Sequence, residues 1–120
     1  MILNTIPVND AIHRLAELAG QKVSVFGTLS LEFEATCITQ IPKTEVSEYD
    51  AGTYQSSIWV DFDLAAIKQP EQWLNQFDGR RVRVTGKLVA SLDGYDGCGH
   101  FSMWPARLIA ASIEKFRRQG

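Results

Sequence analysis

The amino-acid sequence predicts a mainly β fold: a five-stranded Greek-key barrel with one helix before it and a second helix between the third and fourth strands. Three observations predict this fold. Apolar and polar residues alternate in several segments of strand length. Apolar residues recur at helical spacing in two further segments. A ten-residue pattern occurs twice, at 20–29 and 79–88, and each copy places a glycine in the middle of a predicted strand.

The predicted elements begin with a helix at residues 8 to 19, where apolar side chains share one face and a glycine follows the last of them. Residues 22 to 34 form the first strand, and Gly27 in its middle predicts a bulge or a bend. Residues 35 to 41 form the second strand. A polar loop at residues 43 to 54 follows it.

The second half of the chain supplies three more strands. Alternating apolar side chains predict the third strand at residues 57 to 62. A helix then begins at Pro70, because proline suits the first turn of a helix. The fourth strand spans residues 80 to 91, again with a central glycine. The last strand is expected around residues 101 to 113, with an edge position or a bulge at Pro105.

The order of these elements, with bent first and fourth strands, is that of the OB-fold, a five-stranded partly open barrel. The chain also resembles a group of small bacterial OB-like proteins that are mostly uncharacterised. The segments that carry the resemblance are KVSVFGTLSLEFE, SIWVDFD, DGRRVRVTGKLV and GCGHFSMWPARLIAASI. The resemblance implies an OB-like barrel and no catalytic residues, since the group has no assigned activity. A different small barrel or a sandwich is the alternative fold.

We therefore expect residues 1 to 120 to form a single OB-like domain. A chain of 120 residues, 45% of them hydrophobic, is long and apolar enough for one core. Residues 1 to 19 would be an N-terminal helical extension, residues 20 to 113 the barrel, and residues 114 to 120 a basic tail.

Charge is distributed unevenly along the chain. Residues 31 to 63 hold seven acids and one base, whereas residues 79 to 120 hold eight bases and three acids. The net charge of −2 argues against a protein that coats nucleic acid through bulk positive charge. The uneven distribution makes charge the best indication of how the protein recognises a partner.

The acidic segment predicts a protein-binding face, because OB-fold ligands usually lie across the second and third strands and their loops. The expected partner-binding residues are Trp59, Asp61, Glu45, Glu48, Tyr49, Asp50 and Tyr54. Carboxylates repel phosphate and steer a basic protein, while aromatic side chains anchor it. An inhibitor or immunity-type protein that covers a basic toxin or nuclease is one concrete form of this function. The alternative is that the acids only solvate a loop and that Trp59 packs beneath it.

The basic segment leaves single-stranded nucleic-acid binding as the alternative function. Arg81 and Arg83 share the outward face of the fourth strand, and Lys87 and Tyr95 complete the alternative site. The pattern lacks stacking aromatic residues at the same spacing, so protein binding is the preferred prediction.

The sequence predicts neither an enzyme nor a cofactor. Cys98 and His100 are the candidates for a metal site, but C-x-H is not the spacing of zinc ligands, and a glycine-rich turn explains the segment better. No phosphate-binding loop, Rossmann glycine motif or metalloprotease helix occurs.

The sequence also predicts the compartment. No apolar run reaches the ~20 residues of a membrane span, the N-terminus lacks the features of a signal peptide, and two cysteines are too few for a disulfide scaffold. We therefore expect a soluble cytoplasmic protein without a membrane partner.

Overall fold

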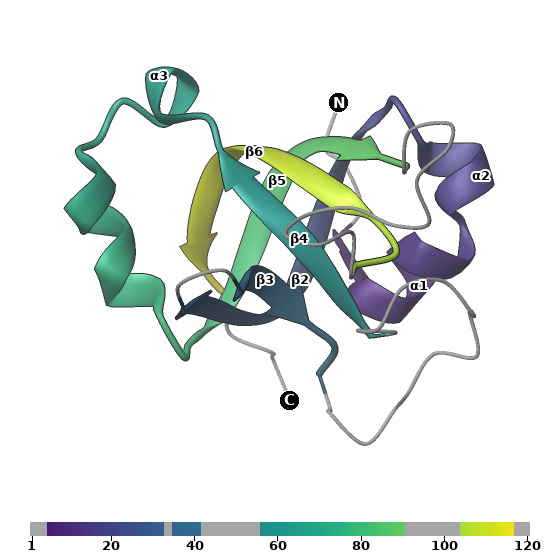
Figure 1. The fold of residues 1–120 in the computed structure, drawn as a ribbon, viewed down its shortest axis with the longest axis horizontal. Coiled ribbons are helices and arrows are strands. Elements are labelled where there is room, and N and C mark those ends of the chain that lie inside the picture. The colour runs from purple at the N-terminus through teal and green to yellow at the C-terminus, as the bar shows by residue number, and fades with distance from the viewer. Residues whose placement is uncertain (1–4, 33–34, 42–55, 91–103, 117–120) are drawn as a thin grey trace.

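The fold is mainly β, with one sheet flanked by short helices (Figure 1). The computed structural model describes residues 5–32, 35–41, 56–90 and 104–116. Within these ranges the strands are β1 (Thr5–Pro7), β2 (Lys22–Glu32), β3 (Ala35–Thr39), β4 (Ser57–Phe62), β5 (Arg81–Val89) and β6 (Arg107–Lys115). The helices are α1 (Val8–His13), α2 (Leu15–Leu18), α3 (Leu64–Ile67) and the 3₁₀ helix η1 (Glu71–Phe77).

The strands pair in an order that leads back to β2. Strand β2 pairs antiparallel with β3, and β3 pairs antiparallel with β4. Strand β4 then pairs parallel with β6, β6 antiparallel with β5, and β5 antiparallel with β2. The additional β2–β5 pairing turns the sheet into a partial ring. Strand β1 lies outside this ring and pairs parallel with the first half of β2.

The central glycine of each copy of the repeated pattern, Gly27 or Gly86, occupies a point of close approach between strands. At Gly86 the β5–β6 register shifts, which fits the predicted bulge. A Cβ atom at Gly86 would lie 2.0 Å from the carbonyl oxygen of Ile109. At Gly27 the prediction was a bulge or a bend; the β2–β5 register continues there without a shift, so no bulge interrupts this pairing. A Cβ atom at Gly27 would lie 2.5 Å from the Thr39 carbonyl oxygen, which explains the glycine instead.

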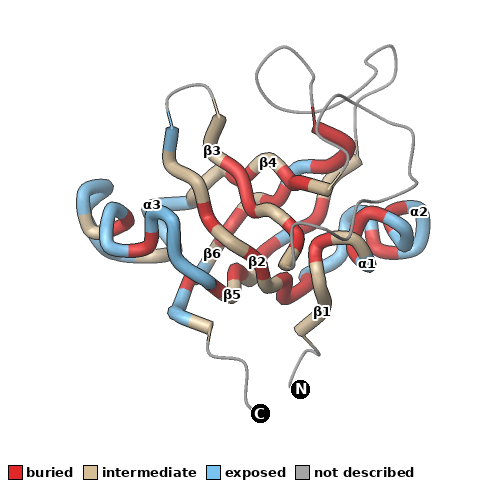
Figure 2. Tube along the Cα trace, turned by 90° about the horizontal axis from the view of Figure 1, so that it is seen from below, coloured by how far each residue is buried: buried red, intermediate tan, exposed pale blue. Residues whose placement is uncertain are grey.

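Apolar side chains from every strand of the partial ring fill its inside. Figure 2 shows the buried residues concentrated along the central strands and the exposed ones on the helices at either side. Fully buried side chains from the strands include Val25, Leu29, Ile38, Ile58, Val82, Val84, Leu88 and Leu108. The N-terminal segment extends this core, because Val8, Ala11 and Ile12 of α1 and Leu15 and Leu18 of α2 are also buried.

The N-terminal segment differs from the predicted single helix at residues 8 to 19. It forms a short strand followed by two helices separated at Arg14, whose φ is −99° and ψ 18°. Backbone hydrogen bonds still connect Arg14 N to Asp10 O at 2.9 Å and Leu18 N to Arg14 O at 2.8 Å. The buried residues therefore keep their helical spacing while the backbone is distorted at one residue.

Three further elements differ in type or extent from the prediction. The segment after Pro70 is a 3₁₀ helix, with Trp73 N donating to Pro70 O at 2.9 Å. Before Pro70 the chain also forms the one-turn helix α3, in which the Asp63 side chain accepts a hydrogen bond from Ala66 N at 3.3 Å. Strand β6 begins after Pro105 and reaches Lys115, two residues beyond the predicted end.

None of the helices in the described part of the chain is long and apolar enough to cross a bilayer.

Candidate functional site

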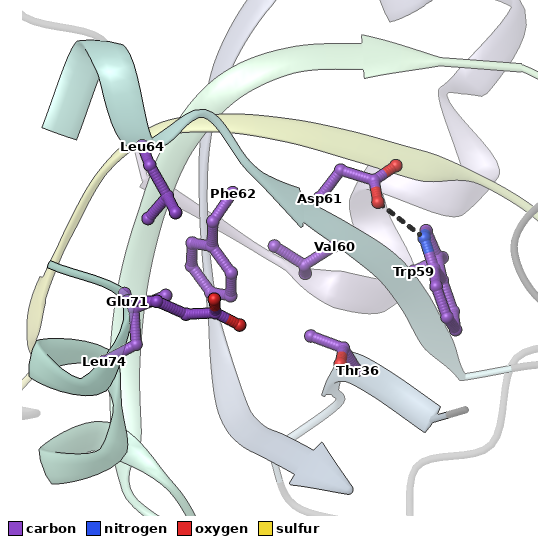
Figure 3. Close-up of a pocket in the computed structure, with 8 residues that line it drawn as sticks. All are labelled: Thr36, Trp59, Val60, Asp61, Phe62, Leu64, Glu71 and Leu74. Atoms are coloured by element: carbon purple, nitrogen blue, oxygen red, sulfur yellow. Dashed lines mark hydrogen bonds between the residues drawn. The ribbon is translucent and has the colours of Figure 1, made fainter. Parts of the chain in front are cut away.

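A cavity of about 250 Å³ opens between β3, β4, α3 and η1 (Figure 3). It exists because β3 and β4 diverge. Their pairing reaches Cys37 opposite Trp59, whereas β4 stays paired with β6 as far as Phe62. The helices after β4 close the other side. The lining residues are Thr36, Trp59, Val60, Asp61, Phe62, Leu64, Glu71 and Leu74.

The cavity combines an apolar floor with an accessible rim. Val60 is 2% exposed and Leu74 is 5% exposed, so both form part of the core beneath the opening. Leu64 is 37% exposed, more than any other large hydrophobic side chain among the described residues. The exposure of Phe62 is intermediate between that of the buried Val60 and Leu74 and that of Leu64. A partner side chain entering the cavity would meet apolar surface from two helices and a strand.

Trp59 and Asp61, the two predicted partner-binding residues in the described ranges, lie together at this cavity. The Trp59 indole Nε1 donates a hydrogen bond to Asp61 Oδ1 at 3.1 Å. The Trp59 ring packs against buried Trp104, with ring centroids 4.8 Å apart and an interplanar angle of 59°. This packing holds the Trp59 ring in one orientation while it remains half-buried.

The negative charge at the cavity is partly neutralised. Asp61 forms an ion pair with Arg107 of β6, and both side chains are about two-fifths exposed, at 41% and 44%. This contact connects the acidic and basic segments of the sequence, because parallel pairing places β4 beside β6. Glu71 is exposed on η1 and has no ion-pair partner among the described residues. In Figure 3 its side chain extends from η1 towards the cavity, so Glu71 places at the opening a carboxylate that no described cation neutralises.

Two other carboxylates near this region hold the backbone in place. Asp63 caps α3, as described above, and Asp78 Oδ1 accepts a hydrogen bond from Leu31 N at 2.9 Å. Of these two, only Asp63 belongs to the acidic segment at residues 31 to 63, and its carboxylate makes a structural contact.

The remaining residues of the predicted sites lie outside the described ranges. These are Glu45, Glu48, Tyr49, Asp50 and Tyr54 of the partner-binding set, Tyr95 of the alternative set, and the metal candidates Cys98 and His100. Within the described ranges, no three His, Cys, Asp or Glu side chains group in a way that could hold a metal ion.

The three cations predicted to bind nucleic acid all lie on β5, but they differ in their surroundings. Arg83 forms an ion pair with Glu114 of β6. Lys87 lies six residues further along β5 than Arg81, a distance of about 20 Å in a strand. Arg81 instead lines a second cavity with Arg80, Lys115 and Phe116. The sequence prediction missed Arg80, Lys115 and Phe116 as members of a site. The sequence does place these basic and aromatic residues at the start of one predicted strand and just after the end of another. Their proximity follows only from the pairing of β5 with β6.

Comparison with known proteins found no family model that matches this chain and no match among curated proteins. Among solved structures, the chain is similar to the crystal structure of a DUF3299 family protein from Pseudomonas aeruginosa PAO1. The two chains are 15% identical, and the match covers 96% of this chain and 85% of that chain with a TM-score of 0.47.

Proposed function

We propose that this protein is a non-enzymatic protein-binding module that holds a basic segment of its partner at the cavity between β3, β4, α3 and η1. The observation that carries the proposal is the combination, at one opening, of exposed Leu64, the Trp59 ring packed on Trp104, and the Glu71 carboxylate, which has no ion-pair partner in the described part of the chain. Binding sites between proteins commonly join an apolar anchor pocket to charged groups at the rim. A partner segment with a lysine or arginine next to a leucine or an aromatic residue would place its apolar side chain in the cavity and its positive charge near the carboxylate at the rim.

We also propose that the partial ring is an OB-like barrel. The support is the pairing order β2–β3–β4–β6–β5 with return to β2, together with helices inserted between β4 and β5. In an OB-fold the second and third strands carry the ligand face, and β3 and β4 hold those positions here. The cavity lies beside these two strands. An inhibitor or immunity-type protein that covers a basic toxin or nuclease remains one form of this function.

The proposal is tested by selecting ligands from a displayed library of random peptides. The selected peptides should be enriched in Lys or Arg next to large apolar residues. Glu71→Lys and Leu64→Asn should each weaken binding of a selected peptide about tenfold, equivalent to about 1.4 kcal/mol. Both side chains lie at the rim, so the fold should tolerate these changes.

Matched controls come from neighbouring positions that do not line the cavity. Gln72→Lys adds a lysine next to Glu71 on η1, and Ala65→Asn adds an amide next to Leu64 on α3; both positions are exposed. These controls should bind the peptide within twofold of the original protein. Peptides that bind the Glu71 and Leu64 variants as tightly as the original protein would show that the cavity is not the binding site.

A further inference from the structure

A second cavity, of about 290 Å³, lies where β5 begins and β6 ends. Its lining residues are Arg80, Arg81, Lys115 and Phe116, so three of the four lining residues are cationic. It shares no lining residue with the cavity between β3, β4, α3 and η1. The site argued below is therefore independent of the proposed protein-binding function.

The backbone around this second cavity is fixed by hydrogen bonds. Phe116 N donates to Arg81 O at 3.0 Å, and Leu29 N donates to Arg80 O at 3.0 Å. Lys115 lies opposite Val82 in the β5–β6 register. These contacts hold the Cα atoms of all four residues close together while the three cationic side chains remain exposed.

The charge in this cavity is not compensated within the described part of the chain. Other arginines are paired: Arg14 with Glu17, Arg83 with Glu114 and Arg107 with Asp61. No described carboxylate forms an ion pair with the three cations of the cavity. Three like charges in a small volume repel one another, and an anion placed between them removes that repulsion. Phosphate suits such a position because it accepts several charge-assisted hydrogen bonds.

An aromatic pair adjoins the cations. The rings of Phe26 and Phe116 stack with centroids 4.8 Å apart and an interplanar angle of 20°. Both residues are half-buried, and Phe26 lies opposite Arg83 in the β2–β5 register. Nucleobases stack on aromatic side chains that adjoin cations, whereas the carboxylates of an acidic peptide would contact only the cations. The sequence alone does not reveal the pair, because its two members are 90 positions apart.

We propose that this second cavity binds a nucleotide, with the phosphate between Arg80, Arg81 and Lys115 and the base against the ring of Phe116. The phosphate and base can belong to a free nucleotide or to a single-stranded nucleic acid, since both present the same chemistry. The site differs from the one predicted from the sequence, because Arg83 and Lys87 do not line it.

The test is a titration of fluorescent oligo(dT) into the full chain, with adenosine monophosphate and inorganic phosphate as competitors. Three cations predict that affinity falls roughly 20-fold between 50 and 200 mM salt, given a slope of about −0.7 per cation for single strands. Arg81→Gln should weaken binding and reduce that fall to roughly 7-fold. Phe116→Leu should weaken oligonucleotide and nucleotide binding at least about fivefold, because it removes the stacking surface.

Lys87→Gln is the matched control, since it removes an exposed cation of β5 that lies outside the cavity. Its affinity for oligo(dT) should stay within twofold of the original, and thermal unfolding should establish that each variant is folded. If adenosine monophosphate binds as tightly as oligo(dT), the ligand is a free nucleotide. If oligo(dT) binds more tightly, the ligand is a single-stranded nucleic acid. Absence of oligo(dT) and nucleotide binding at low salt overturns the proposal. The proposal is also overturned if inorganic phosphate binds as tightly as the nucleotide, or if Lys87→Gln and Arg81→Gln lower the affinity for oligo(dT) equally.

Discussion

Replacing Gly86 with alanine should destabilise the protein more than any other glycine substitution in the described strands and turns. The new Cβ atom would lie 2.0 Å from the Ile109 carbonyl oxygen, 2.7 Å from the Ile109 carbonyl carbon and 2.8 Å from the Ala110 Cα. All three atoms belong to the backbone of β6, so no side-chain rotation relieves the overlap and the two strands must move apart. Overpacking of this kind costs about 3 kcal/mol. That is a large fraction of the ~5–15 kcal/mol that stabilises a typical domain.

The free energy of unfolding can be measured by urea denaturation followed by circular dichroism, with calorimetry giving the melting temperature. A loss of about 3 kcal/mol in a chain of this size lowers the melting temperature by about 10 °C. Gly27→Ala should cost less, about 2 kcal/mol, because two of its three close contacts are side-chain atoms of Ile38 and Val8 that can adjust. Gly79→Ala meets no atom within 4 Å and loses only about 1 kcal/mol from its φ of +72°. If Gly79→Ala costs as much as Gly86→Ala, the steric argument is wrong.

Two further predictions concern the ion pairs. Arg107→Gln should change the free energy of unfolding by less than about 1 kcal/mol, because the pair with Asp61 is exposed. The same variant should bind lysine-containing peptides more tightly, since it leaves Asp61 uncompensated, and peptide titration checks this; weaker binding would count against the acidic rim. A hydrogen bond from Arg14 and its positive charge lower the pKa of the Glu17 carboxyl. Because the folded state has the lower pKa, the pair stabilises the protein above the ordinary pKa of glutamate, and this contribution disappears as the pH falls through the folded value. Titration by nuclear magnetic resonance should give a Glu17 pKa below its ordinary value in the original protein and at that value in Arg14→Gln. An equal pKa in the two proteins would contradict the ion pair.

Local patterns in the sequence predicted much of the sheet. Alternation of apolar residues located β4 and β5 to within one or two residues, because each strand buries one face. The repeated glycine pattern correctly indicated special positions in β2 and β5. It could not separate a bulge from a close backbone approach, since that depends on which strand lies opposite.

Features that depend on tertiary pairing escaped prediction. Strand β1 has three residues and no alternation to detect, and its parallel partner fixes its conformation. The neutralisation of Asp61 by Arg107 needed the knowledge that β4 and β6 are adjacent. The charge count by segment assigned Asp61 to the acidic segment and Arg107 to the basic segment, and so did not predict that they pair. Of the residues that line the candidate site, the sequence prediction included Trp59 and Asp61 but not Leu64 and Glu71, because the path of the chain after β4 brings these two to the cavity.

The parallel pairing of β4 with β6 also affects how the protein folds. Trp59 pairs with Arg107, and Lys22 of β2 pairs with Lys87 of β5, so the partial ring depends on contacts between residues about 50 to 65 positions apart. Chains dominated by such nonlocal contacts fold on a millisecond-to-second timescale, because the entropy of closing long loops is lost before the contacts form. Until β6 arrives, one edge of β4 and one edge of β5 remain unpaired. Folding intermediates with exposed strand edges associate readily, so refolding yield should decline as protein concentration rises.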